Sequence, residues 1–173
     1  MDKLYDLFPD SARDLKLNLQ NVLKQPELTP QQTWGTAVAC ALAARNPRVT
    51  GEVLAAASQP LTPEALDAAR SAAAIMGMNN IYYRFQHLSG NERYKEIPAR
   101  LRMQAIRNHG ADPVDFELWC LAVSAINGCA ICITSHEHVL LDKGVTEETI
   151  LAAVRIASVI HGAAGVIDAT PAA

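Results

Sequence analysis

Apolar residues recur three and four positions apart along most of this chain, and the strict alternation of half-buried strands is scarce. Short polar breaks separate these stretches. Thr29, Thr62 and Asp112 each stand directly before a proline, the arrangement of an N-cap followed by the first helical position. The pattern therefore predicts an all-α protein. The predicted helices are 12–24, 30–45, 47–58, 63–83, 100–107, 113–126, 129–143 and a long last helix from about 146.

The two halves of the chain resemble each other. Trp34 and Val38 match Trp119 and Val123 when the second half is aligned on the first. The identities are few and rich in alanine, so chance similarity is the alternative explanation. We predict a single domain over residues 1–173 with an internally duplicated helical motif, whose halves are about 30–86 and 113–170.

Composition and charge narrow the class of protein. Half of the 173 residues are hydrophobic and the formal net charge is -3, which argues against electrostatic binding of nucleic acid. The first residues lack the charged-then-apolar layout of a signal peptide, and no apolar run approaches the roughly 20 residues that span a membrane. We therefore expect a globular cytoplasmic protein with neither a membrane nor a nucleic acid as partner.

The most informative motif is a cysteine pair followed by a histidine. Cys129 and Cys132 stand three positions apart, His136 follows four positions later, and Glu117 precedes them on the predicted helix before. Residues three and four positions apart share one helical face, so the two thiols and the imidazole are neighbours. Where thiols are kept reduced, such a pair is typical of a catalytic or metal-binding site.

These residue types can form and use a thiolate. Cys129 begins a helix after Gly128, where backbone N–H groups and the helix dipole favour an anion. His136 can pair with Cys132, and Glu117 can accept a proton from either group. A thiolate attacks a peroxide to give a sulfenic acid, which the second cysteine converts to a disulfide. Exchange with another dithiol is the alternative chemistry.

A zinc site is the competing interpretation of the same residues. His136 and His138 add two ligands to the cysteine pair, but they point in different directions on a helix. On this alternative the chain is a helical interaction protein with a redox or zinc switch. Because four ligands do not converge, we expect no bound metal or cofactor. Cys40 and Cys120 lie in apolar helices and are expected in the core.

Several segments carry a resemblance to a known family. They are Phe116-Glu117-Leu118-Trp119, the run from Val123 to Cys129, Ser135-His136-Glu137-His138 and the run from Ile75 to Asn80. Together with the cysteine motif they resemble the alkylhydroperoxidase D family, within the carboxymuconolactone decarboxylase-like superfamily. The similarity covers nearly the whole chain. It implies an all-helical fold with a duplicated motif and a homotrimeric assembly.

The resemblance also implies an activity and partners. Members reduce alkyl hydroperoxides and pass electrons to a partner peroxiredoxin of the AhpC type. Their electrons come from the dihydrolipoyl group of a lipoylated acyltransferase in a 2-oxoacid dehydrogenase complex. A lactone decarboxylase of the same superfamily is the alternative enzyme, although its reaction needs no cysteine pair.

The resemblance assigns a role to each site residue. Cys132 occupies the position of the thiol that attacks peroxide, Cys129 that of the thiol that resolves it, and Glu117 and His136 those of the proton relay. The position at the start of a helix alone favours Cys129 as the more acidic thiol, so the two arguments conflict. Ile131 replaces a histidine of well-known members, which predicts a slower proton shuttle with intact dithiol chemistry.

Overall fold

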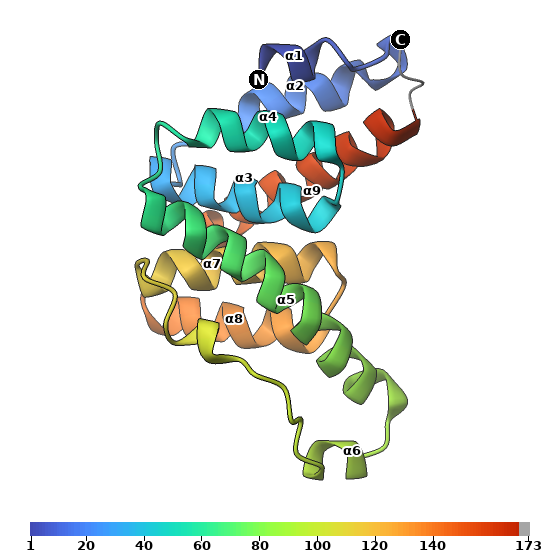
Figure 1. Ribbon diagram of the computed structural model, residues 1–173, viewed down its shortest axis with the longest axis vertical. Coiled ribbons are helices and arrows are strands. Elements are labelled where there is room, and N and C mark those ends of the chain that lie inside the picture. Colours follow the sequence, from blue (N-terminus) through green and yellow to red (C-terminus); the bar gives the residue numbers. More distant parts are fainter. Residues whose placement is uncertain (170–173) are drawn as a thin grey trace.

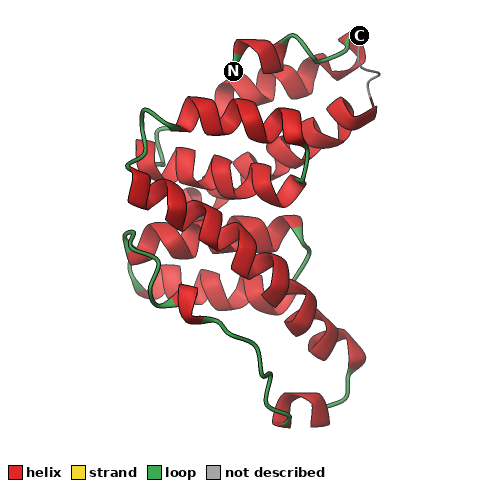
Figure 2. Ribbon diagram, viewed as in Figure 1, coloured by secondary structure: helices red, strands yellow, loops and turns green. Residues whose placement is uncertain are grey.

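A computed structural model describes residues 1–169, and their regular structure is helical throughout, as Figures 1 and 2 show. The all-α prediction is therefore confirmed for the described part of the chain. The helices are α1 (Asp2–Tyr5), α2 (Arg13–Val22), α3 (Pro30–Ala44), α4 (Pro47–Ala57), α5 (Pro63–Ser89), α6 (Arg93–Glu96), α7 (Pro113–Ile126), α8 (Ala130–Asp142) and α9 (Glu147–Ala169), with short 3-10 turns η1 (Asp10–Ala12) and η2 (Gln104–Ile106).

Helix starts lie where the sequence predicts them. Thr29 and Gln32 form a capping box at the start of α3, and the Thr62 side chain accepts a hydrogen bond from the Ala65 amide in α5. Asp112 accepts from two backbone amides at the start of α7. These caps are local interactions between neighbours in the sequence, which is why the sequence alone reveals them.

The predicted helix over 100–107 is wrong. Only η2 forms there, and Arg100 has a φ of 52°, outside the right-handed helical region. None of residues 100–107 is fully buried, and only Met103 and Ile106 pack partly against the core, which is too little apolar contact to stabilise a longer helix. In contrast α5 continues to Ser89, beyond the predicted end at 83. Its last turns leave the body of the molecule and lead to α6 (Figure 1).

The core surrounds α3, which packs against α5, α7 and α9. A close approach between α3 and α7 fixes this arrangement. A Cβ added at Gly35 would lie 2.2 Å from two ring carbons of Trp119, whose side chain is fully buried. Glycine at this position is therefore what lets the indole reach α3, and Trp119 in turn orients α7.

The last helix, α9, is more apolar than expected, since we expected no apolar run long enough to span a membrane. By length and composition α9 is able to cross a membrane, with a mean hydropathy of 1.9 over its most apolar window. However, 56% of that window is buried inside the fold, and α9 packs against α2, α3 and α7. Core helices of this kind pass the same test, so α9 is weak evidence for a membrane span.

Helix lengths follow a similar order in the two parts of the chain. The helices α3, α4 and α5 have 15, 11 and 27 residues, and α7, α8 and α9 have 13 to 23 residues. The internal duplication over 30–86 and 113–170 stays a prediction, and residues 170–173 lie outside the described part of the chain.

The contact between Gly35 and Trp119 leads to a stability prediction. Gly35→Ala should lower the free energy of unfolding by about 1–3 kcal/mol, because the new methyl group overpacks the core. Gly51→Ala, at an exposed position of α4, is the control, since an added Cβ meets nothing within 4 Å. This control should be neutral or stabilise by about 0.5–1 kcal/mol. Urea denaturation measures both, and equal stabilities would contradict the packing argument.

Candidate active site

The turn between α7 and α8 delivers the cysteine pair. Gly128 has a φ of 64°, the left-handed conformation that glycine adopts most readily after a helix. Cys129 follows as the N-cap of α8, and its amide donates to the Ser124 carbonyl at 3.1 Å. Cys129 and Cys132 are joined by a disulfide, with their Cα atoms 5.3 Å apart. The structure therefore shows the oxidised form of the pair.

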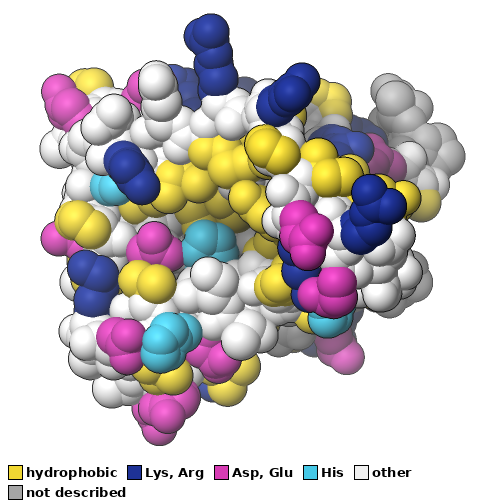
Figure 3. All heavy atoms as spheres, turned by 90° about the horizontal axis from the view of Figure 1, so that it is seen from below, with side chains coloured by type: hydrophobic (Ala, Val, Ile, Leu, Met, Phe, Trp, Pro, Cys, Tyr) yellow, Lys and Arg dark blue, Asp and Glu magenta, His cyan; other side chains and the backbone are white. Residues whose placement is uncertain are grey.

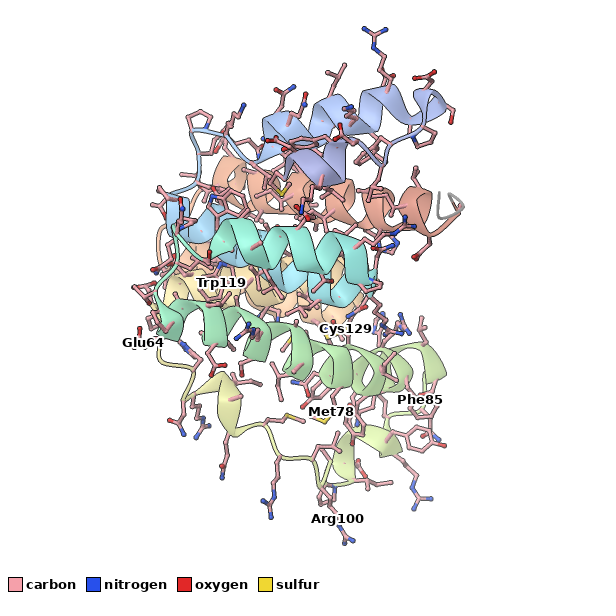
Figure 4. All side chains as sticks on the ribbon, turned by 45° about the horizontal axis from the view of Figure 1, so that its top comes forward. Glu64, Met78, Phe85, Arg100, Trp119 and Cys129 are labelled. Carbon is pink, nitrogen blue, oxygen red and sulfur yellow. A yellow bond between two sulfur atoms is a disulfide. The ribbon has the colours of Figure 1, made fainter. Side chains whose placement is uncertain are left out.

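Helix α5 holds this turn in place. The buried Asn80 amide donates to the Ser124 hydroxyl at 2.9 Å, and its carbonyl oxygen accepts from the Asn127 amide at 2.9 Å. The Arg84 guanidinium donates to the Asn127 carbonyl. Figure 4 shows Cys129 beside the middle of α5. These contacts fix where α8 begins, and hence where both sulfur atoms lie.

Glu117 and His136 form the polar part of the site. Glu117 on α7 and His136 on α8 meet at 2.6 Å between Oε2 and Nδ1, and their side chains are only 19% and 13% exposed. A contact this short and sheltered is typical of a charge-assisted hydrogen bond. The other ring nitrogen, Nε2, lies 3.3 Å from the sulfur of Met76 on α5. Three helices thus hold the imidazole.

A cavity of about 390 Å³ opens beside these groups. Cys132, Glu117 and His136 line it together with Ile131, and most of the remaining wall is apolar. Seen from below, hydrophobic side chains gather in a hollowed band on this face (Figure 3). Cys132 is 7% exposed, whereas Cys129 is not exposed. The cavity therefore gives access to one sulfur of the pair.

The sequence motif predicted most of this arrangement. Glu117, Cys132 and His136 line one cavity, and Cys129 joins them through the disulfide. The direct pairing of His136 with Cys132 is not what the oxidised form shows, because both ring nitrogens have other partners. Sequence reasoning missed the Met76 contact. The polar pair Asn79-Asn80 inside an apolar helix was the signal that this part of α5 faces the site.

The structure also places the other two cysteines and the histidine that the zinc hypothesis would need. Cys40 and Cys120 are buried free thiols, as expected, and burial raises the pKa of both; the charge of Glu117 adds to the effect at Cys120. His138 is 76% exposed and lies 3.4 Å from Asp142. Within residues 1–169, no group of three or more His, Cys, Asp or Glu is placed to hold a metal ion.

A helical fold with a CxxC disulfide beside a carboxylate–imidazole pair defines a thiol-dependent redox protein. Comparison with known proteins identifies the family within this class. Residues 92–173 match the model of the carboxymuconolactone decarboxylase family. An alkyl hydroperoxide reductase AhpD from Solibacter usitatus is 61% identical over 168 residues, which cover 97% of this chain and 95% of that protein. The AhpD of Acidobacterium capsulatum is 57% identical over 170 residues, 98% of this chain and 93% of that protein. The chain belongs to the AhpD family of alkyl hydroperoxide reductases.

Thiol labelling should separate the two kinds of cysteine. Iodoacetamide should leave the oxidised protein unmodified and should modify Cys132 first after mild reduction. Cys40 and Cys120 should react only after denaturation, because they are buried and the pKa of each thiol is raised. Peptide mass spectrometry reads the result. Modification of Cys40 or Cys120 in the native protein would contradict their placement in the core.

Proposed function

We propose that this alkyl hydroperoxide reductase works through its Cys129–Cys132 dithiol, with Cys132 as the thiol that attacks peroxide. The observation that carries the proposal is the shared cavity: Cys132 lines it with Glu117 and His136, and Cys129 is fully buried. A hydroperoxide entering this cavity meets one sulfur. Access therefore supports the role that the family resemblance gives to Cys132 over the argument from the helix start, which favours Cys129.

The reaction proceeds in two steps. The Cys132 thiolate attacks the terminal oxygen of the hydroperoxide, the O–O bond breaks, and the leaving alkoxide takes up a proton to become an alcohol. Cys132 is then a sulfenic acid. The Cys129 thiol attacks its sulfur, a disulfide forms and water leaves. One hydroperoxide and two thiols thus give one alcohol, one water and the disulfide that the structure contains.

Glu117 and His136 supply and remove the protons. The 2.6 Å contact lets a proton pass between the carboxylate and the imidazole within a sheltered site. Since Nε2 of His136 faces Met76 in the oxidised form, Glu117 is the group that exchanges the proton with Cys132, directly or through water. Ile131, 42% exposed on the same cavity, adds no titratable group, so this chain relies on Glu117 and His136.

Reduction closes the cycle. We propose that a dihydrolipoyl group on the acyltransferase of a 2-oxoacid dehydrogenase complex donates two electrons and becomes a cyclic disulfide. The apolar wall of the cavity suits the aliphatic chain of that group. The regenerated dithiol also reduces the disulfide of a partner peroxiredoxin of the AhpC type. The cytoplasm, where thiols are kept reduced, is the proposed location.

The projecting part of α5 supports the proposed homotrimer. Ile81, Phe85 and Leu88 are more than half exposed, and Ile97 beyond α6 is 55% exposed. Phe85 and Arg100 lie away from the body of the molecule (Figure 4). Copies of the chain would cover this apolar surface. Light scattering should give three times the chain mass of 18.7 kDa, and a monomer would contradict the trimer.

The alternatives have less support. A zinc switch needs converging ligands, and His138 points to the outer face of α8 beside Asp142. A lactone decarboxylase would leave the disulfide and the Glu117–His136 pair without a purpose. Relatives that cover nearly the whole chain are named alkyl hydroperoxide reductases.

Steady-state turnover tests the proposed function. The native chain should consume a small alkyl hydroperoxide with dihydrolipoamide as reductant, and both Cys129→Ser and Cys132→Ser should lose sustained turnover. A matched control is Cys120→Ser, which lies outside the cavity and should keep activity if it folds. Turnover that survives in Cys132→Ser would contradict the proposal. Disulfide reduction without peroxide consumption would restrict the chain to disulfide exchange.

The pH dependence tests the relay. Glu117→Gln keeps an acceptor for His136 but cannot take up a proton, so peroxide consumption at neutral pH should fall about 100-fold. The pH–rate profile should move to higher pH, with recovery above the ordinary thiol pKa of about 8.5. Glu137→Gln, exposed on α8, is the control. An unchanged profile in Glu117→Gln would remove this residue from the mechanism.

A further inference from the structure

One face of α5 forms part of the cavity wall. Met76, Asn79 and Tyr83 are spaced three and four positions apart, so they share this face, and all three line the cavity. Two of them have partners. The Met76 sulfur meets Nε2 of His136, and the Tyr83 hydroxyl lies 3.6 Å from the Met103 sulfur. The third residue, Asn79, has a side-chain oxygen without a hydrogen-bond partner.

Asn79 carries an unsatisfied buried acceptor. Its side chain is 4% exposed, yet its Oδ1 has no hydrogen-bond partner. Among residues 1–169, only the Trp119 Nε1 shares this state, and that atom lies against Gly35 in the core. An unpaired buried polar group lowers stability, so its presence calls for a reason. The neighbouring Asn80 shows the contrast, because both ends of its amide are hydrogen-bonded.

The position of Asn79 indicates what satisfies it. The cavity wall around it is largely apolar, and the sulfur that reacts with peroxide lines the same cavity. A ligand with one O–H donor and an apolar body matches these surroundings. An alkyl hydroperoxide is such a ligand. A dihydrolipoyl thiol also enters an apolar cavity, but S–H is a weak donor and gains little from an amide oxygen.

We propose that Asn79 binds the hydroperoxide, accepting a hydrogen bond from its O–H group and thereby holding the terminal oxygen towards Cys132. This inference rests on the proposed function and adds a substrate-binding residue to it. The S–O bond forms as the O–O bond breaks, the electron pair leaves on the alkoxide, and the proton comes from the Glu117–His136 pair. The Asn79 amide stays neutral and keeps its protons. It therefore acts on the oxidation step alone.

The two half-reactions can be measured separately. In stopped flow, the reduced protein is mixed with cumene hydroperoxide, and the oxidised protein is mixed with dihydrolipoamide. Asn79→Leu should be oxidised at least 10-fold more slowly than the native chain, while its reduction stays within twofold. Its melting temperature should stay equal or rise, because an unpaired buried polar group has been removed. Asn79→Ala repeats the test without requiring space for a larger side chain.

The neighbouring residue provides the matched control. Asn80→Leu removes an amide that is fully paired, so it should lower the melting temperature and disturb both half-reactions. Asn79→Ser, which keeps an oxygen acceptor, should recover part of the oxidation rate. Asn79 variants that are oxidised at the native rate would overturn the inference alone. So would variants that lose both half-reactions equally. A native chain that hydroperoxide does not oxidise would overturn the proposed function as well.

Discussion

The whole site depends on the way α5 holds the turn between α7 and α8. Asn80 is hydrogen-bonded to Ser124 in the last turn of α7 and to Asn127, the residue that ends α7, and the Ser124 carbonyl accepts from the amide of Cys129 at the start of α8. The sulfur atoms of Cys129 and Cys132 are placed by that turn. The same helix contributes Met76 to the imidazole of His136. One helix thus contacts both the turn that carries the thiols and the imidazole of His136.

The packing of α7 against α3 in the core also fixes the site. Gly35 lets the Trp119 ring reach α3, and Trp119 lies two positions after Glu117 on α7. The carboxylate therefore belongs to a helix whose orientation is fixed by tight packing. Two adjacent asparagines on α5 differ in their hydrogen bonds. The side chain of Asn80 is hydrogen-bonded at both ends and holds the turn, whereas the side-chain oxygen of Asn79 is unpaired beside the cavity. A local loss of stability at a site where substrate binds is typical of enzymes.

Local features were predictable from the sequence and distant contacts were not. The caps at Thr29 and Asp112 involve neighbouring residues, and the two cysteines that meet in a disulfide stand only three positions apart at the start of α8. The contact between Met76 and His136 joins residues 60 positions apart, which no periodicity reveals. The helix predicted over 100–107 is wrong because helical stability depends on a buried face, and this segment packs only Met103 and Ile106 partly against the core. The apolar character of α9 is explained by its burial in the core, because it packs against α2, α3 and α7.

The proposed mechanism requires that Cys132, and not Cys129, meets the peroxide. Chemical trapping of the sulfenic acid distinguishes the two thiols. Each single variant, Cys129→Ser and Cys132→Ser, is reduced, treated with one equivalent of hydroperoxide and then with dimedone, and the adduct is located by peptide mass spectrometry. An adduct is expected on Cys132 in Cys129→Ser, and none is expected in Cys132→Ser. An adduct on Cys129 formed at a similar rate would contradict it.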